Sequence, residues 1–161
     1  MLEVPAAVPR LFMGMMTEKY RPDGFLYWSI VSWMPRVRSG LGAVADGPRT
    51  NWHPATCNTD NEEGNLFVPG RDLKILPTIR IENFRDGVED LWYYRMLEEL
   101  VKQAERKSGF DKALLARSQK ALAVPESLIL STDQYNTEPE ALRSIRRELA
   151  ECMEEMQKKL K

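Results

Sequence analysis

The sequence predicts a mixed fold that begins in the α/β manner and continues as α+β. Residues 25–33 (FLYWSIVSW) are apolar or aromatic at almost every position, which is typical of a strand buried on both faces. After Arg85, apolar residues instead recur at helical spacing. We therefore expect two parts, residues 1–64 with the buried strand and a long loop, and residues 65–161 with a hairpin and helices, forming one continuous structural unit.

The composition is that of an ordinary globular chain. Its 161 residues are 43% hydrophobic and 29% charged, which is enough for one real core. The 23 basic and 24 acidic residues nearly cancel, so no nucleic acid or anionic membrane partner is expected. No stretch reaches the roughly 18 apolar residues of a membrane span. The N-terminus lacks the basic region of a secretory signal and is interrupted by Pro5 and Pro9.

The first part predicts one helix, one strand and one loop. A helix is expected over residues 9–20, ended by the turn sequence RPDG at 21–24. A strand buried on both faces needs parallel neighbours, and none is predicted before residues 25–33. We therefore expect the chain to be the end of a larger protein. Residues 34–64 are rich in Gly and Pro, and loops of that length are usually functional or disordered.

The second part predicts a hairpin and three helices. Two short strands are expected at 65–69 and 73–82, with Pro77 placing the second at an edge or a bulge. The first helix follows Arg85 and has Gly109 as its stop signal. The second helix is expected over 111–123. The third helix begins with a capping box at Thr137-Glu138-Pro139-Glu140 and continues to Leu160.

A dense charged cluster stands where the second strand meets the first of these helices, and it admits two interpretations. It could be a catalytic or ligand site, or a structural clasp in which Asp86 is the helix N-cap and Glu89 completes a capping box. Because Arg80 and Arg85 can supply partners for the carboxylates of the cluster, we favour the clasp. Gly87 would allow another backbone to approach closely. The cluster consists of Arg80, Glu82, Arg85, Asp86, Glu89 and Asp90.

Three blocks in this order resemble a known family. They are RLFMGMMTEKYRPDGFLYWSIVSW, EGNLFVPG and TIRIENFRDGVEDLWYYRMLEEL. They resemble the C-terminal region of bacterial glycoside hydrolase-like proteins that carry the domain of unknown function 4091 and are related to glycoside hydrolase family 123. The resemblance covers about residues 5 to 105. The family pattern is matched by Arg80, Glu82, Arg85, Asp86, Gly87, Glu89, Asp90 and Tyr93.

The resemblance implies the last helix and last strand of a (β/α)8 barrel, at residues 9–20 and 24–33, followed by a small accessory region. The long loop would then leave the C-terminal end of that strand, where barrel enzymes hold their substrates. The catalytic Asp-Glu pair of the related family, which acts on N-acetyl-β-galactosaminides with the help of the substrate's acetamido group, has no match here, because the sequence has no Asp-Glu dipeptide. That pair is expected upstream of Met1, so the upstream barrel is the expected partner and the chain is not expected to act alone.

Several side chains are candidates for contact with carbohydrate. Tyr27, Trp33 and Trp52 could stack on sugar rings, although aromatic residues of this kind are also common in a core. His53 could hydrogen-bond a sugar hydroxyl. His53 and Cys57 have a spacing seen in metal sites, but no second such pair exists, so neither a metal nor a cofactor is expected. The competing interpretation is a non-catalytic α+β module that binds a protein or a carbohydrate.

Overall fold

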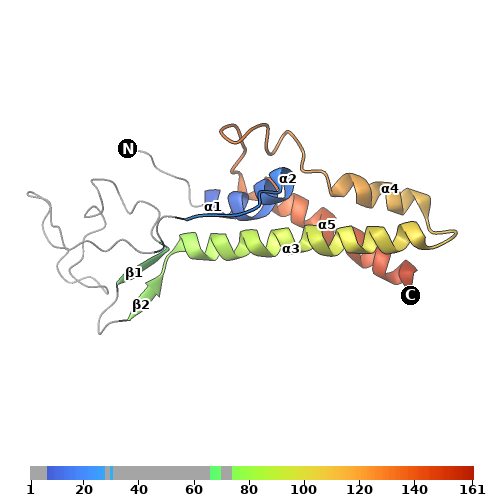
Figure 1. Cartoon of the computed structure of the whole chain (residues 1–161), viewed down its shortest axis with the longest axis horizontal. Helices are drawn as coiled ribbons and strands as arrows, with labels where there is room; N and C mark the ends of the chain where they lie inside the picture. The colour runs from blue at the N-terminus through green and yellow to red at the C-terminus, as the bar shows by residue number, and fades with distance from the viewer. Residues whose placement is uncertain (1–6, 28–29, 31–65, 70–73) are drawn as a thin grey trace, which may run out of the picture.

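The computed structural model describes residues 7–27, 30, 66–69 and 74–161. One long helix, α3 (Ile79–Arg106), runs through this part of the chain, and the other elements pack along it (Figure 1). Helices predominate, with one two-stranded antiparallel sheet, so the described part belongs to the α+β class. The other elements are α1 (Val8–Leu11), the π-helix η1 (Phe12–Met16), α2 (Thr17–Tyr20), β1 (Phe67–Pro69), β2 (Ile75–Pro77), α4 (Lys112–Ala121) and α5 (Pro139–Leu160).

The predicted N-terminal helix is confirmed. α1, η1 and α2 follow one another without a break and end at Arg21, whose φ of 44° reverses the chain. The widened turn of η1 leaves the carbonyl of Phe12 available, and the hydroxyl of Thr17 donates a hydrogen bond to it at 2.7 Å. The RPDG sequence thus ends the helix where its turn residues predicted.

The predicted hairpin is confirmed, but its second strand is shorter than expected. β1 and β2 pair antiparallel with Val68 opposite Leu76. The strand stops at Pro77, and the predicted strand residues 79–82 lie in the first turn of α3. Thr78 decides the boundary, because its hydroxyl accepts a hydrogen bond from the backbone N–H of Arg80 at 3.2 Å and so caps the helix.

The prediction of a buried strand at 25–33 is wrong for the residues of that segment that are described, 25–27 and 30. They belong to no strand, and the side chains of Phe25, Leu26 and Ile30 are 54%, 84% and 53% exposed. A strand exists only where a neighbour completes a ladder of backbone hydrogen bonds. The N–H of Leu66 donates to the carbonyl oxygen of Ile30 at 3.0 Å, but the described strands β1 and β2 pair with each other and form no ladder with this segment. The remaining residues of the predicted strand lie outside the described part.

The three predicted C-terminal helices are confirmed as α3, α4 and α5. Gly109, with a φ of +76°, turns the chain after α3, and the carboxylate of Asp111 caps α4. The capping box predicted at residues 137–140 is wrong, because Glu138 is the N-cap of α5 and makes no side-chain cap hydrogen bond. Pro139 instead occupies the first turn, where its missing N–H removes no helical hydrogen bond.

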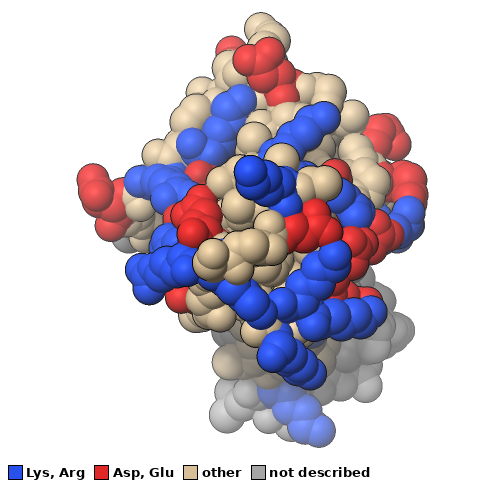
Figure 2. All heavy atoms as spheres, turned by 90° about the vertical axis from the view of Figure 1, so that its right-hand side faces the viewer, with Lys and Arg blue, Asp and Glu red and all other residues tan. Residues whose placement is uncertain are grey.

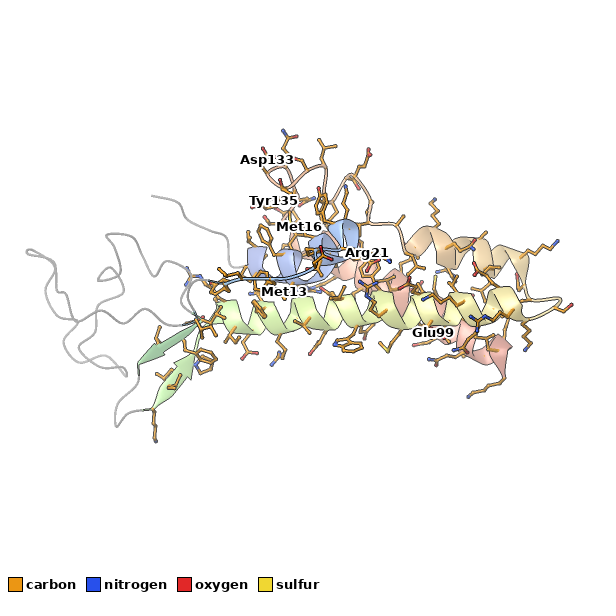
Figure 3. All side chains as sticks on the ribbon, in the orientation of Figure 1. Met13, Met16, Arg21, Glu99, Asp133 and Tyr135 are labelled. Carbon is orange, nitrogen blue, oxygen red and sulfur yellow. The ribbon has the colours of Figure 1, made fainter. Side chains whose placement is uncertain are left out.

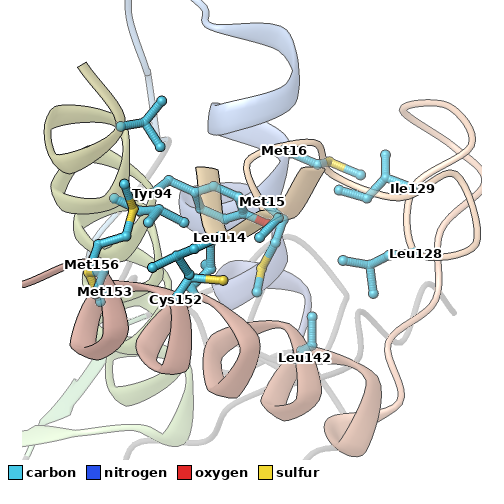
Figure 4. Packing of buried hydrophobic residues seen from close by; sticks show 14 of the residues in the cluster. Met15, Met16, Tyr94, Leu114, Leu128, Ile129, Leu142, Cys152, Met153 and Met156 are labelled. Carbon is cyan, nitrogen blue, oxygen red and sulfur yellow. The ribbon is translucent and has the colours of Figure 1, made fainter. Parts of the chain in front are cut away.

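A single hydrophobic core joins the helices (Figure 4). The helical run at 8–20 shares it with the C-terminal helices, so residues on both sides of the predicted boundary at 64 pack together. None of the described helices is both long enough and apolar enough to cross a membrane. The fully buried side chains at the centre of the hydrophobic core include Leu11, Met15, Tyr94, Leu97, Ile129, Leu142, Leu149 and Met156.

Candidate functional site

The candidate site is built where the N-terminal helical run meets α3. Gly14 and Gly87 bring the two backbones together, since a Cβ on Gly87 would lie 2.5 Å from the carbonyl oxygen of Arg10. A Cβ on Gly14 would lie 3.0 Å from the carbonyl oxygen of Gly87. Both glycines are therefore needed for this approach, and Gly87 has the role that the sequence predicted.

Asp90, one turn beyond Gly87, is the centre of a three-helix ion cluster. Its side chain is fully buried, and Arg10 of α1 donates to it twice, from Nε to Oδ2 at 2.7 Å and from Nη2 to Oδ1 at 3.2 Å. Arg146 of α5 donates from Nε to the same carboxylate. Charge-assisted bonds of this paired geometry are the strong ones. We call Arg10, Asp90 and Arg146 the clasp, because they join α1, α3 and α5.

Arg146 is held by more than Asp90. Its Nη2 donates to the carbonyl oxygen of Asp86 at 2.9 Å and approaches Glu89 Oε2 at 3.4 Å. Its guanidinium lies 5.3 Å from the centre of the Tyr93 ring, in the geometry of a cation–π contact. Burial alone would lower the pKa of Arg146, but the charges of Asp90, Glu89 and Asp86 and the hydrogen bond to Asp90 raise it. Arg146 therefore stays a cation.

The predicted role of Asp86 is wrong. α3 begins at Ile79, so Asp86 lies two turns inside the helix and cannot be its N-cap, and Glu89 completes no capping box. The predicted strand at 73–82 ended in an alternation of only two apolar residues, Ile79 and Ile81, which is too short to distinguish a strand from the first turn of a helix. Of the six residues predicted for the clasp, Asp90 is the buried one that ties other helices to α3.

The exposed members of the predicted cluster form a surface ion network. Arg85 lies 2.6 Å from Glu82 and 3.6 Å from both Asp86 and Glu89, and its side chain is 63% exposed. Exposed pairs of this kind contribute about 0–1 kcal/mol. Arg80 sits in the first turn, where its backbone N–H donates to the Thr78 hydroxyl. The network adds little to the stability that the clasp provides.

A second ion cluster continues the contact between the two helices toward their C-terminal ends. Glu18 is nearly buried and lies 2.6 Å from Arg21 and 3.3 Å from Arg95. Arg21, labelled at the end of α2 in Figure 3, also reaches Glu98 at 3.6 Å. Burial raises the pKa of Glu98, but the hydrogen bond from Arg95 and the charges of Lys102 and Arg21 lower it overall. Glu98 is therefore ionised at neutral pH.

The order of these contacts fixes the direction of the helices. Arg10 meets Asp90, Glu18 meets Arg95, and Arg21 meets Glu98. Partners further along one helix thus meet partners further along the other, so the N-terminal run and α3 are parallel neighbours.

The chain after α2 then runs back along α3. The rings of Phe25 and Tyr27 stack at 6.2 Å, and both contact Phe84, at 5.7 and 6.3 Å. From Glu98 back to Phe84 is about 21 Å of helix at about 1.5 Å per residue. Because Arg21 contacts Glu98 and Tyr27 contacts Phe84, the six residues from Arg21 to Tyr27 have to span a similar distance. They reach about 20 Å only in an extended conformation, at about 3.3 Å per residue. The segment is therefore extended and antiparallel to α3, as Figure 1 shows.

The predicted carbohydrate contacts are not brought together in the described part of the chain. Tyr27 is half-buried beside Phe84, and burial raises the pKa of its hydroxyl while the positive charge of Arg80 opposes this. Trp33, Trp52 and His53 lie outside the described residues, as does Cys57. No group of three or more His, Cys, Asp or Glu side chains in the described ranges could hold a metal ion.

The far end of the molecule carries charges of both signs. Figure 2 shows Lys and Arg side chains interspersed with Asp and Glu at the end where α3 and α5 finish. Some of these groups act structurally, because Lys107 Nζ donates to the carbonyl oxygens of Lys159 and Leu160 at 2.8 and 3.2 Å. Cations at helix C-termini also suit the helix dipole. We therefore interpret this surface as a solvated end of the molecule, at which Lys107 stabilises the last turn of α5.

Sequence reasoning missed two members of the clasp, Arg10 and Arg146. Arg10 sits between Val8 and Leu11, and Arg146 follows Ile145 in the apolar stripe of α5. A charge inside an apolar stripe is the only signal that a single sequence offers for such a buried partner. That signal does not say which acidic residue it will meet.

Comparison with known proteins found no match. No family model matches the chain, and no curated protein and no solved structure is significantly similar to it. The site therefore has to be interpreted from its own geometry.

Proposed function

We propose that this chain is the C-terminal, non-catalytic part of a glycoside hydrolase-like barrel protein that acts on carbohydrate. The intact protein would hydrolyse a glycosidic bond, and this part would complete the barrel. The observation that carries the proposal is the pair of parallel helices with an extended, apolar segment returning between their ends.

That arrangement is the one expected of a helix, a strand and the following helix in a (β/α)8 barrel. In such a barrel each strand lies beneath the helices that precede and follow it, and the helices are parallel neighbours in an outer ring. Here the helical run 8–20 precedes the segment and α3 follows it. The sequence resemblance independently implies that residues 9–20 are a last barrel helix and residues 24–33 the last barrel strand. We further propose that α3 is the barrel helix that follows this strand.

The exposure of the extended segment also supports the proposal that an upstream barrel packs against this part of the chain. Phe25, Leu26 and Ile30 have large apolar side chains that are more than half exposed. Soluble proteins rarely leave several such side chains together in water without a partner. Neighbouring strands of an upstream barrel would cover them and complete the backbone hydrogen bonds.

The clasp has a structural role in this proposal. It fixes the last two barrel helices to each other through Arg10 and Asp90, and ties α5 over them through Arg146. Every oxygen of the Asp90 carboxylate accepts a hydrogen bond from an arginine. A general acid or base needs a carboxylate that can reach substrate and exchange a proton, and a fully buried, doubly paired one cannot do so.

The competing function is a non-catalytic module that binds a protein or a carbohydrate. The exposed apolar side chains favour a binding role of some kind, and they fit a separate partner as well as an upstream barrel. The two functions differ in what the intact gene product does to a glycoside.

The test is to read the gene upstream of Met1 and to express the longer product. The proposal expects strand and helix repeats with an Asp-Glu pair, and hydrolysis of a nitrophenyl N-acetyl-β-galactosaminide by the longer product. The 161-residue chain alone should be inactive, as should the longer product with Asn-Gln in place of the pair. Absence of an upstream reading frame, or a folded longer product that cleaves no glycoside, would favour the binding module.

A further inference from the structure

We draw no further inference here: the strongest candidate, the exposed apolar strip that Trp92 and Met96 form on the surface of α3, carries nothing because nothing in the described part of the structure shows what covers it.

Discussion

Replacing Asp90 by Asn tests the clasp most sharply. The substitution keeps the shape of the side chain, so it opens no cavity, but it removes the negative charge between Arg10 and Arg146. Two guanidinium groups are then left facing an amide. We expect the chain to lose stability because the positive charges of Arg10 and Arg146 would then be buried without a negative partner at this position.

The expected loss follows from the burial of the three partners. The side chain of Asp90 is 0% exposed, that of Arg10 is 10% exposed and that of Arg146 is 26% exposed. Removing one partner of a buried ion pair typically lowers the free energy of unfolding by about 3–5 kcal/mol. For a chain of this size that corresponds to a fall of about 6–20 °C in melting temperature, at about 2–4 °C per kcal/mol.

Urea unfolding followed by far-UV circular dichroism measures this loss, with Glu89→Gln as the matched control. Glu89 also faces Arg146, at 3.4 Å, but its side chain is 49% exposed, so its substitution should change the free energy of unfolding by no more than about 1 kcal/mol. In a double-mutant cycle, Asp90→Asn and Arg10→Met should show a coupling of about 1–3 kcal/mol. If Asp90→Asn is no less stable than Glu89→Gln, the clasp does not hold the helices together.

Three further substitutions test neighbouring features. Gly87→Ala should destabilise by about 1–3 kcal/mol because its Cβ meets the backbone of α1, whereas Gly24→Ala, which meets nothing, should be neutral or slightly stabilising in the same urea titration. Thr78→Ala should lower the free energy of unfolding by about 1 kcal/mol through loss of the N-cap, and Asp86→Ala should change it less; the reverse order would restore Asp86 as the cap. The hydrogen bond from Lys159 lowers the pKa of Asp111, so its stabilising contribution is present at neutral pH and is lost as the pH falls through that lowered pKa. The urea midpoints of wild type and Asp111→Asn should therefore differ at neutral pH and converge in strong acid, and a constant difference would contradict the assignment.

The helices could be predicted from the sequence because local signals and tertiary packing agree. The apolar stripe of α5, the stop at Gly109 and the turn after α2 each depend on residues close together in the chain. The role of Gly87 could also be predicted, since a glycine inside a helical pattern often marks a place where another backbone packs closely against the helix.

The errors arose where the outcome depends on distant residues or on very short patterns. Two alternating isoleucines do not distinguish a strand from a first helical turn, and Thr78 settled the choice. The partners of Asp90 lie 80 and 56 residues away along the chain, and charge type alone cannot select them. The apolar segment at 25–33 has the composition of a buried strand, but a strand also needs neighbours.

The most direct test of the account is glycoside hydrolysis by the longer gene product that we propose, compared with the 161-residue chain, on a nitrophenyl N-acetyl-β-galactosaminide. We predict release of nitrophenol by the intact product and none by the chain alone. We also predict that Asp90→Asn in the intact product lowers its melting temperature but leaves kcat unchanged at temperatures where the variant remains folded. Hydrolysis by the chain alone, or loss of kcat in a folded Asp90→Asn variant, would contradict the assignment of a structural, barrel-completing role.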